Sequence, residues 1–145
     1  MRTVLIAQLN SRFANALAAP LAEAGYRTIT CPGPWPPALR CIRCDVGFCP
    51  LTEAADLLIY DPDLVGYDEE GRRHRLATDS AYAHPDLPLL LAWPQEEQRP
   101  SLDIILEEVP RARLAAFEPD KLVEQVWELI GPPNPYARAP WALRV

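Results

Sequence analysis

The sequence lacks a hydrophobic run long enough to cross a membrane. Its longest apolar stretch, LPLLLAWP at residues 87–94, falls far short of the ~20 residues that a membrane-spanning helix requires. The N-terminal apolar run is interrupted by Gln8, Asn10 and Arg12 before it reaches the length of a signal peptide. We therefore expect a cytoplasmic protein without a membrane partner.

Positive charge is also scarce. Fourteen Lys and Arg residues face twenty Asp and Glu residues, which gives a net charge of −6, and Lys121 is the only lysine. Because the chain has too few cations for a broad basic face, we expect no nucleic-acid partner. The segment DEEGRRHR at residues 68–75 predicts a solvated loop with local ion pairs, and His74 and His84 are interpreted as surface groups rather than metal ligands.

Several catalytic signatures are missing as well. The sequence holds no Ser/His/Asp set in a recognisable pattern, no phosphate-binding P-loop and no dinucleotide-binding glycine fingerprint. We therefore expect a protein without enzymatic activity. Its 145 residues suit one domain with a single core.

What the sequence does contain is an alternation of strand-like and helix-like segments. Asn10 or Ser11 can cap the first helix and Gly25 can end it, while Ser101 can cap a later one. The clearest helix covers residues 118–131, with a predicted apolar stripe of Leu122, Val126, Leu129 and Ile130. The strand-like runs lie at residues 3–7, 26–31, 56–61 and 87–93, with a weaker one at 112–117. This alternation predicts an α/β fold with a doubly wound, five-stranded parallel sheet.

The most specific stretch is ADLLIYDPDLVG at residues 55–66, a buried strand that ends on an acid and continues into a Pro- and Gly-containing loop. Together with the spacing of the other βα units, it resembles a response-regulator receiver (CheY-like) domain of flavodoxin-like fold. The resemblance covers residues 1–131, leaving a Pro-rich tail at 132–145. It implies that Asp61 stands at the position of the phospho-accepting aspartate.

The rest of the receiver phosphorylation site is degenerate. Receivers hold Mg²⁺ with an acidic pair after the first strand, and add a hydroxyl residue after the fourth strand and a lysine after the fifth. The positions of the acidic pair read Gln8 and Leu9, that of the hydroxyl Ala92 or Trp93, and that of the lysine Ala115. We therefore do not expect Mg²⁺, and interpret Asp61 and Asp63 as turn-forming residues.

All four cysteines lie in the Pro-rich stretch CPGPWPPALRCIRCDVGFCP at residues 31–50, where a receiver has its second helix. Cys41 and Cys44 form a Cys-x₂-Cys pair that can chelate a metal, with Cys31 and Cys49 as the remaining thiolate ligands of a structural zinc ion. Disulfides, an iron–sulfur cluster and free packed thiols remain alternatives.

Aromatic residues mark a further surface. Trp127 lies on the last predicted helix, and Tyr136 and Trp141 lie in the tail. Exposed aromatic residues can form a contact surface with a protein partner or a second copy of the chain, or the tail can fold back over its own core.

These observations favour a non-enzymatic, receiver-like regulatory or protein-interaction module in signal transduction, whose Cys-rich loop binds structural zinc or forms a disulfide. One alternative is an atypical receiver that accepts a phosphoryl group on Asp61. Another is a thiol-based redox or metal sensor.

Overall fold

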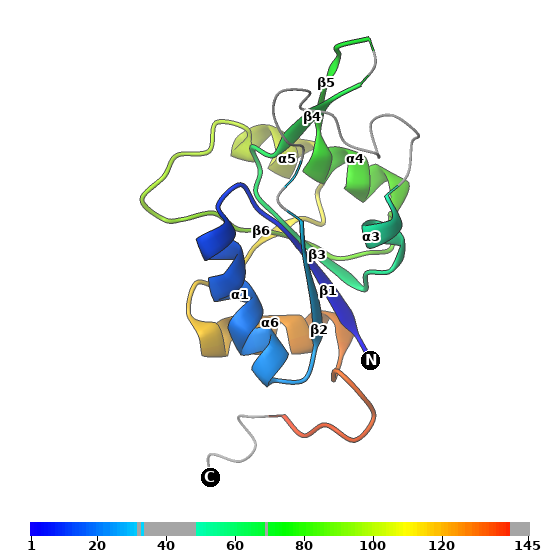
Figure 1. Ribbon diagram of the computed structural model, residues 1–145, viewed down its shortest axis with the longest axis vertical. Helices are drawn as coiled ribbons and strands as arrows, with labels where there is room; N and C mark the ends of the chain where they lie inside the picture. The colour runs from blue at the N-terminus through cyan, green and yellow to red at the C-terminus, as the bar shows by residue number, and fades with distance from the viewer. Residues whose placement is uncertain (32, 34–48, 69, 140–145) are drawn as a thin grey trace.

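The computed structural model describes residues 1–31, 33, 49–68 and 70–139. They form one parallel sheet with helices on both faces and a small antiparallel hairpin at one end (Figure 1). The elements, in chain order, are β1 (Thr3–Ala7), α1 (Ser11–Glu23), β2 (Arg27–Cys31), α3 (Pro50–Glu53), β3 (Leu57–Tyr60), β4 (Val65–Tyr67), β5 (Arg73–Arg75), α4 (Leu76–Ala83), β6 (Leu89–Leu91), α5 (Leu102–Glu108), β7 (Arg113–Leu114) and α6 (Pro119–Ile130).

The sheet has the strand order β2-β1-β3-β6-β7, and every neighbouring pair is parallel. Strand β1 lies inside the sheet, between β2 and β3, and is fully buried, as the uninterrupted apolar run predicts for a strand covered on both faces. This confirms the predicted doubly wound, five-stranded sheet. The fifth strand is shorter than predicted, with only Arg113–Leu114 in β7.

Alternation along the strands divides the core into two layers. Val4 and Ile6 of β1 belong to the cluster formed with α1 and α6, whereas Leu5 and Ala7 belong to the cluster formed with α4 and α5. The same period of two separates Leu57 and Ile59 from Leu58 and Tyr60 in β3, since successive side chains of a strand point to opposite faces.

The first helix begins as the sequence predicts. The side chain of Asn10 accepts a hydrogen bond from the backbone N–H of Phe13 at 3.0 Å, and Gly25 beyond its end has φ = 105°. Pro20 lies inside the helix near its C-terminal end. Leu17 and Leu21 bury the helical face against the sheet.

Helix α6 is confirmed, but its apolar stripe is narrower than predicted. Leu122 and Val126 are buried, whereas Leu129 is 41% exposed. The prediction for Leu129 was wrong because Leu122, Val123 and Val126 already define the buried face of the helix. Ser101 stands at the N-cap of α5, yet its side chain makes no capping hydrogen bond.

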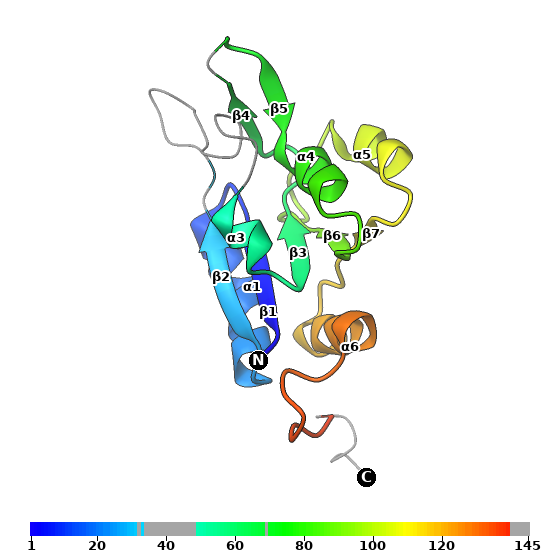
Figure 2. The ribbon, with the colours of Figure 1, turned by 90° about the vertical axis from the view of Figure 1, so that its right-hand side faces the viewer.

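The segment between β3 and α4 departs most from expectation. A solvated loop was predicted for residues 68–75, but β5 lies within that segment and pairs with β4 as an antiparallel hairpin, and helix α4 follows it. Figure 2 shows this hairpin projecting from the end of the molecule opposite the N- and C-termini. Across the described part of the chain, no helix is long and apolar enough to span a membrane.

Candidate functional site

The candidate site lies at the carboxyl ends of β1 and β3, the two strands between which the chain changes its winding direction. Ligands of open α/β sheets bind at such a switch point. Asp61 follows β3 directly, and its backbone N–H donates to the carbonyl oxygen of Ala7 at 2.9 Å. The side chain of Asp61 is only 1% exposed. Asp61, at the position that the receiver resemblance indicates, therefore lies at the carboxyl end of β3 but is shielded from solvent.

Asp61 and Asp63 form the turn that the sequence predicts. The Oδ1 atom of Asp61 accepts the backbone N–H of Asp63 at 2.9 Å, and the Asp61 carbonyl accepts the N–H of Leu64 at 3.1 Å. Asp63 does not cap the segment that follows it. Its Oδ1 atom instead accepts the N–H of Ser101, 38 residues away, at 3.1 Å. The turn is thereby attached to the start of α5.

The charge partner of Asp61 is Arg99, which the sequence reasoning missed. Arg99 donates from Nε to Oδ1 at 2.8 Å and from Nη2 to Oδ2 at 2.9 Å. Such a bidentate pair fits the planar fork of the guanidinium to both oxygens of one carboxylate. Both carboxylate oxygens are thus engaged by a cation supplied by the protein itself.

Arg99 is held in this position from several sides. Its side chain is 7% exposed, Nη1 donates to the carbonyl of Gln98 at 2.8 Å, and Nη2 also reaches the Glu97 carboxylate at 3.3 Å. Burial acts to lower the pKa of Arg99, but the hydrogen bonds and charge of Asp61, followed by those of Glu97, outweigh it and raise the pKa. The guanidinium is therefore a permanent countercharge.

The other positions of the phosphorylation site also depart from the receiver pattern. Ala92 and Ala115, at the hydroxyl and lysine positions, are buried apolar residues. Trp93, the other residue at the hydroxyl position, donates its indole N–H to the carbonyl of Glu97 at 3.1 Å. Lys121 lies on α6 with its side chain 64% exposed.

The residues at the acidic-pair positions do not fit Mg²⁺. Neither Gln8 nor Leu9 carries a carboxylate; Gln8 is fully buried and Leu9 is 54% exposed. Neither side-chain amide atom of Gln8 has a hydrogen-bond partner in the described structure. Mg²⁺ prefers carboxylate and water oxygens, but Arg99 already holds both oxygens of Asp61.

Two of the four cysteines can be located. Cys31, at the end of β2, and Cys49, before α3, line the same small apolar cavity of about 20 Å³ with Leu5, Tyr60 and Leu64 among its walls. Cys49 is a free thiol. Cys41 and Cys44 lie outside the described residues. Within the described residues, no group of three or more His, Cys, Asp or Glu side chains is arranged to hold a metal ion, and two of the four predicted zinc ligands are not among those residues.

The two histidines are more closely engaged than isolated surface groups. His74 contacts Asp79 through Nδ1 at 2.9 Å and Asp68 through Nε2 at 3.0 Å. His84 lies 3.6 Å from the carboxylate of Glu53. The local ion pair predicted for residues 68–75 is present between Arg72 and Asp68, at 2.9 Å.

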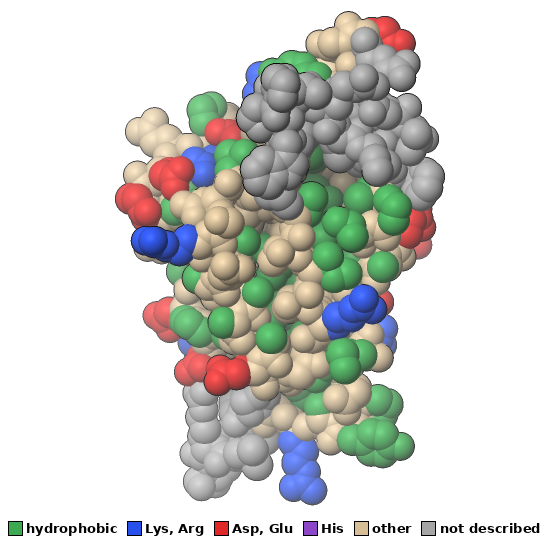
Figure 3. All heavy atoms as spheres, in the orientation of Figure 1, with side chains coloured by type: hydrophobic (Ala, Val, Ile, Leu, Met, Phe, Trp, Pro, Cys, Tyr) green, Lys and Arg blue, Asp and Glu red, His purple; other side chains and the backbone are tan. Residues whose placement is uncertain are grey.

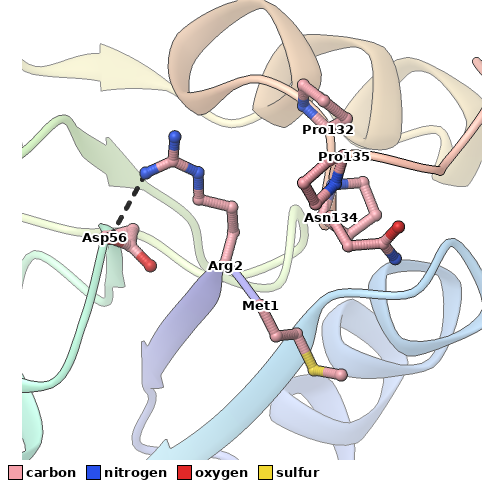
Figure 4. Close-up of a pocket in the computed structure, with 7 residues that line it drawn as sticks. Met1, Arg2, Asp56, Pro132, Asn134 and Pro135 are labelled. Carbon is pink, nitrogen blue, oxygen red and sulfur yellow. Dashed lines mark ion pairs between the residues drawn. The ribbon is translucent and has the colours of Figure 1, made fainter.

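The start of the tail packs back on the domain, at the end of the sheet opposite Asp61. The carbonyl of Pro133 accepts the backbone N–H of Arg2 at 2.8 Å, and Tyr26 donates its hydroxyl to the carbonyl of Gly131 at 2.6 Å. Burial raises the pKa of Tyr26 to about 12, against the smaller opposing effect of Arg2. Figure 4 shows the open pocket of about 350 Å³ that Met1, Arg2 and Asp56 form with the tail prolines.

The aromatic residues proposed as a contact surface differ in solvent exposure. Tyr136 is 92% exposed, Trp127 is half-buried on α6, and Trp141 lies outside the described residues. Leu114 and Phe117, which the sequence reasoning did not select, are 48% and 50% exposed. Phe117 lines an open pocket of about 630 Å³ at the start of α6. On the face seen in Figure 3, hydrophobic side chains lie across the middle and charged ones mostly toward the margins.

Comparison with known proteins identifies the fold. No family model and no curated protein matches the sequence. Several solved structures match in fold, among them the following three. A protein described as the pilus assembly protein CpaE of Burkholderia thailandensis has 20% identity and a TM-score of 0.57, covering 89% of this chain and 98% of its own. A response regulator receiver domain protein of Clostridium thermocellum has 13% identity and a TM-score of 0.59, covering 90% and 94%.

The third structure is a pilus assembly-related protein of Burkholderia pseudomallei, with 21% identity, a TM-score of 0.56 and 90% of each chain covered. At these identities the likeness concerns the fold. It agrees with the strand order and with the helices on both faces of the sheet. The chain has the CheY-like fold of response-regulator receiver domains.

Proposed function

We propose that this chain is a non-enzymatic regulatory module that acts through contacts with another protein or a second copy of itself, without phosphorylation of Asp61. The observation that carries the proposal is the buried bidentate pair between Asp61 and Arg99. A protein with the receiver fold whose acceptor carboxylate is already paired retains the fold but is not able to accept a phosphoryl group.

The physical reason is electrostatic. Phosphoryl transfer to a carboxylate brings several negatively charged oxygens together, so a receiver supplies a divalent cation, a hydroxyl and a lysine. Here one guanidinium stands against Asp61, and the side chains at the other positions are Gln8, Ala92 and Ala115. A phosphodonor would have to displace Arg99 before it could reach either carboxylate oxygen.

The exposed apolar residues Leu114 and Phe117 support a role in protein contacts. Leu114 lies on β7, and Phe117 lies in the turn before α6, where it lines an open pocket. We propose that the partner surface includes them, and that Trp127 and Tyr136 extend it. The low positive charge of the sequence supports a protein partner over a nucleic acid.

The test is phosphodonor labelling followed by intact mass measurement. The purified chain is incubated with acetyl phosphate and Mg²⁺ beside an authentic receiver domain that becomes labelled under the same conditions. We expect the mass of the chain to stay unchanged. A stoichiometric phosphoryl adduct that disappears in Asp61→Asn would overturn the proposal in favour of an atypical phospho-accepting receiver.

A second candidate function is thiol-based sensing by the Cys-rich stretch. Its support is that Cys31 and Cys49, 18 positions apart in sequence, line one small apolar cavity. We propose that the stretch binds structural zinc or forms a disulfide. Mass spectrometry under native and then denaturing conditions distinguishes these outcomes from four free thiols. Retention of four alkylatable thiols in a metal-free protein, unchanged by a mild disulfide oxidant, would rule out this role.

A further inference from the structure

The β4–β5 hairpin is too small to be stable by itself. Each strand has three residues, and Gly66 pairs with His74 at the centre of the ladder. Isolated two-stranded hairpins are at best marginally stable in water. The position of the hairpin must therefore depend on contacts with the rest of the domain.

Asp68 organises the turn of the hairpin. Its Oδ1 atom accepts the backbone N–H groups of Glu70 and Arg72, at 3.0 and 2.9 Å. Its Oδ2 atom accepts Nε of Arg72 at 2.9 Å and faces Nε2 of His74 at 3.0 Å. The hydrogen bond from His74 is the main reason that the pKa of Asp68 lies well below its usual range; burial opposes it, and the bonds from Arg72 reinforce it. Asp68 is thus a carboxylate at neutral pH.

His74 connects this turn to helix α4. Its Nδ1 atom lies 2.9 Å from Oδ2 of Asp79, which belongs to α4, while Nε2 faces Asp68. A neutral imidazole carries one N–H and can donate to one of the two carboxylates, which leaves its other nitrogen facing negative oxygen. Only the imidazolium can donate to both, so the two short contacts favour the protonated ring.

We propose that His74 is a proton-controlled latch that holds the β4–β5 hairpin against α4 while protonated and releases it when the ring becomes neutral. The carboxylates that face the ring are Asp68 of the turn and Asp79 of α4. Among the described residues, the other charged groups on these elements are Glu70, Arg72, Arg73 and Arg75. Arg72 pairs with Asp68 and Glu70, and therefore holds the turn together but does not join it to α4.

The direction of the pH dependence follows from the contacts. The hydrogen bond to Asp68 raises the pKa of His74 above 6.5, burial opposes the shift, and Asp79 adds to it. A raised pKa means that the contribution of His74 to stability is complete below pH 6.5 and is lost as the pH rises through the pKa of the folded protein. Asp68 behaves in the opposite way, since its contribution is lost only as the pH falls through its lowered pKa.

The hairpin is connected to the Asp61 turn. Leu64, between that turn and β4, donates its N–H to the carbonyl of Asp61 and accepts the N–H of Leu76 at the start of α4, both at 3.1 Å. Release of the hairpin would therefore change the surface next to Asp61. The latch depends on contacts within the chain and stands whether or not the proposed partner surface is correct.

The chain offers a matched control because it has two histidines, His74 and His84. Imidazole nitrogen NMR spectra are recorded from pH 5 to 9.5 and assigned with His74→Gln and His84→Gln. We expect His74 to titrate with a midpoint above 6.5, and we expect backbone resonances of β5 and α4 to shift with the same midpoint. A midpoint at or below 6.5, or backbone shifts that do not follow His74, would overturn the latch.

Two further experiments distinguish a latch from simple packing. Asp79→Asn removes one of the two carboxylates that face the ring, so the midpoint of the His74 NMR titration should move to lower pH. Urea unfolding at pH 6 and pH 9 should show a loss of stability at the higher pH in the wild type and in His84→Gln, and a smaller loss in His74→Gln. An equal loss in His74→Gln would contradict the proposal. If that variant does not fold, the wild-type titration still decides.

Discussion

Replacing Arg99 by alanine should destabilise the protein strongly, because it leaves Asp61 as a buried carboxylate without a countercharge. Arg99 donates two charge-assisted hydrogen bonds to Asp61, each contributing roughly 1.5–3 kcal/mol. The two side chains are 7% and 1% exposed, so solvent screens the pair little. Breaking a buried pair by removing one partner costs about 3–5 kcal/mol, which agrees with the sum of the two bonds.

Urea unfolding at pH 7, followed by circular dichroism, measures this loss. In thermal unfolding, the same substitution should lower the Tm by roughly 6–20 °C, because each kcal/mol corresponds to ~2–4 °C for a domain of this size. Arg113→Ala is the matched control, since Arg113 is exposed and donates to the backbone carbonyls of Pro110 and Ala112. We expect the control to stay within about 0.5 kcal/mol of the wild type.

The double replacement of Asp61 by Leu and Arg99 by Met tests the cause. It removes both charges together, so its stability should exceed that of Arg99→Ala, because no unpaired charge remains. A free energy of unfolding for Arg99→Ala within 1 kcal/mol of the wild type would contradict the buried pairing of Asp61 with Arg99, because an unpaired buried carboxylate lowers stability by more than that.

Three other substitutions have defined outcomes. Tyr26→Phe removes the hydrogen bond to Gly131 and should lower the free energy of unfolding in urea by about 1–2 kcal/mol. Because the pKa of Tyr26 is raised to about 12, the wild type should lose stability as the pH rises from 10 through 12, and the variant should lose less. Arg111→Ala removes three bonds to the carbonyls of Leu87, Ala81 and His84, around the end of α4, and should lower the free energy of unfolding by roughly 2–4 kcal/mol, while a value within 0.5 kcal/mol would contradict this role. Gln125→Glu keeps the shape of the side chain but loses its donation to the carbonyl of Leu114; we expect a loss of about 1–2 kcal/mol, and an unchanged denaturation midpoint would show that the bond is not needed.

The sheet was predictable because its signals are local. Residues 3–7 and 57–60 are uninterrupted apolar runs, and such runs identify strands covered on both faces whatever their neighbours are. Helix α6 was predictable for a similar reason, since its apolar spacing lies within one segment. Leu129 was assigned wrongly because spacing gives the width of the buried face only approximately.

The candidate site was only half predictable. The position of Asp61 followed from the resemblance to a receiver, but nothing near Arg99 in the sequence identifies its partner 38 residues away. Arg99 lies in the polar segment QEEQRP, which has the composition of a solvated loop. The one usable signal was indirect: a carboxylate at the end of a buried strand requires a cation, and the receiver's usual lysine is absent.

The hairpin was missed for a different reason. Its strands are three residues long and include Gly66, Arg73 and His74, which carry little intrinsic strand preference. The hairpin depends on Asp68 and on the contact of His74 with Asp79, both of which are tertiary or turn-specific contacts. A histidine with acidic residues six positions before and five positions after it was the available signal.

The pairing of Asp61 with Arg99 is tested most directly by an NMR titration of the wild-type protein with Mg²⁺, observing the side-chain Nε–H of Arg99 and the backbone N–H of Asp61. We expect the Nε–H of Arg99 to exchange slowly with solvent and not to shift as Mg²⁺ is added. Saturable shifts of Asp61 and Gln8, together with loss of protection at Arg99, would contradict it, because they would mean that a divalent cation displaces the guanidinium from Asp61.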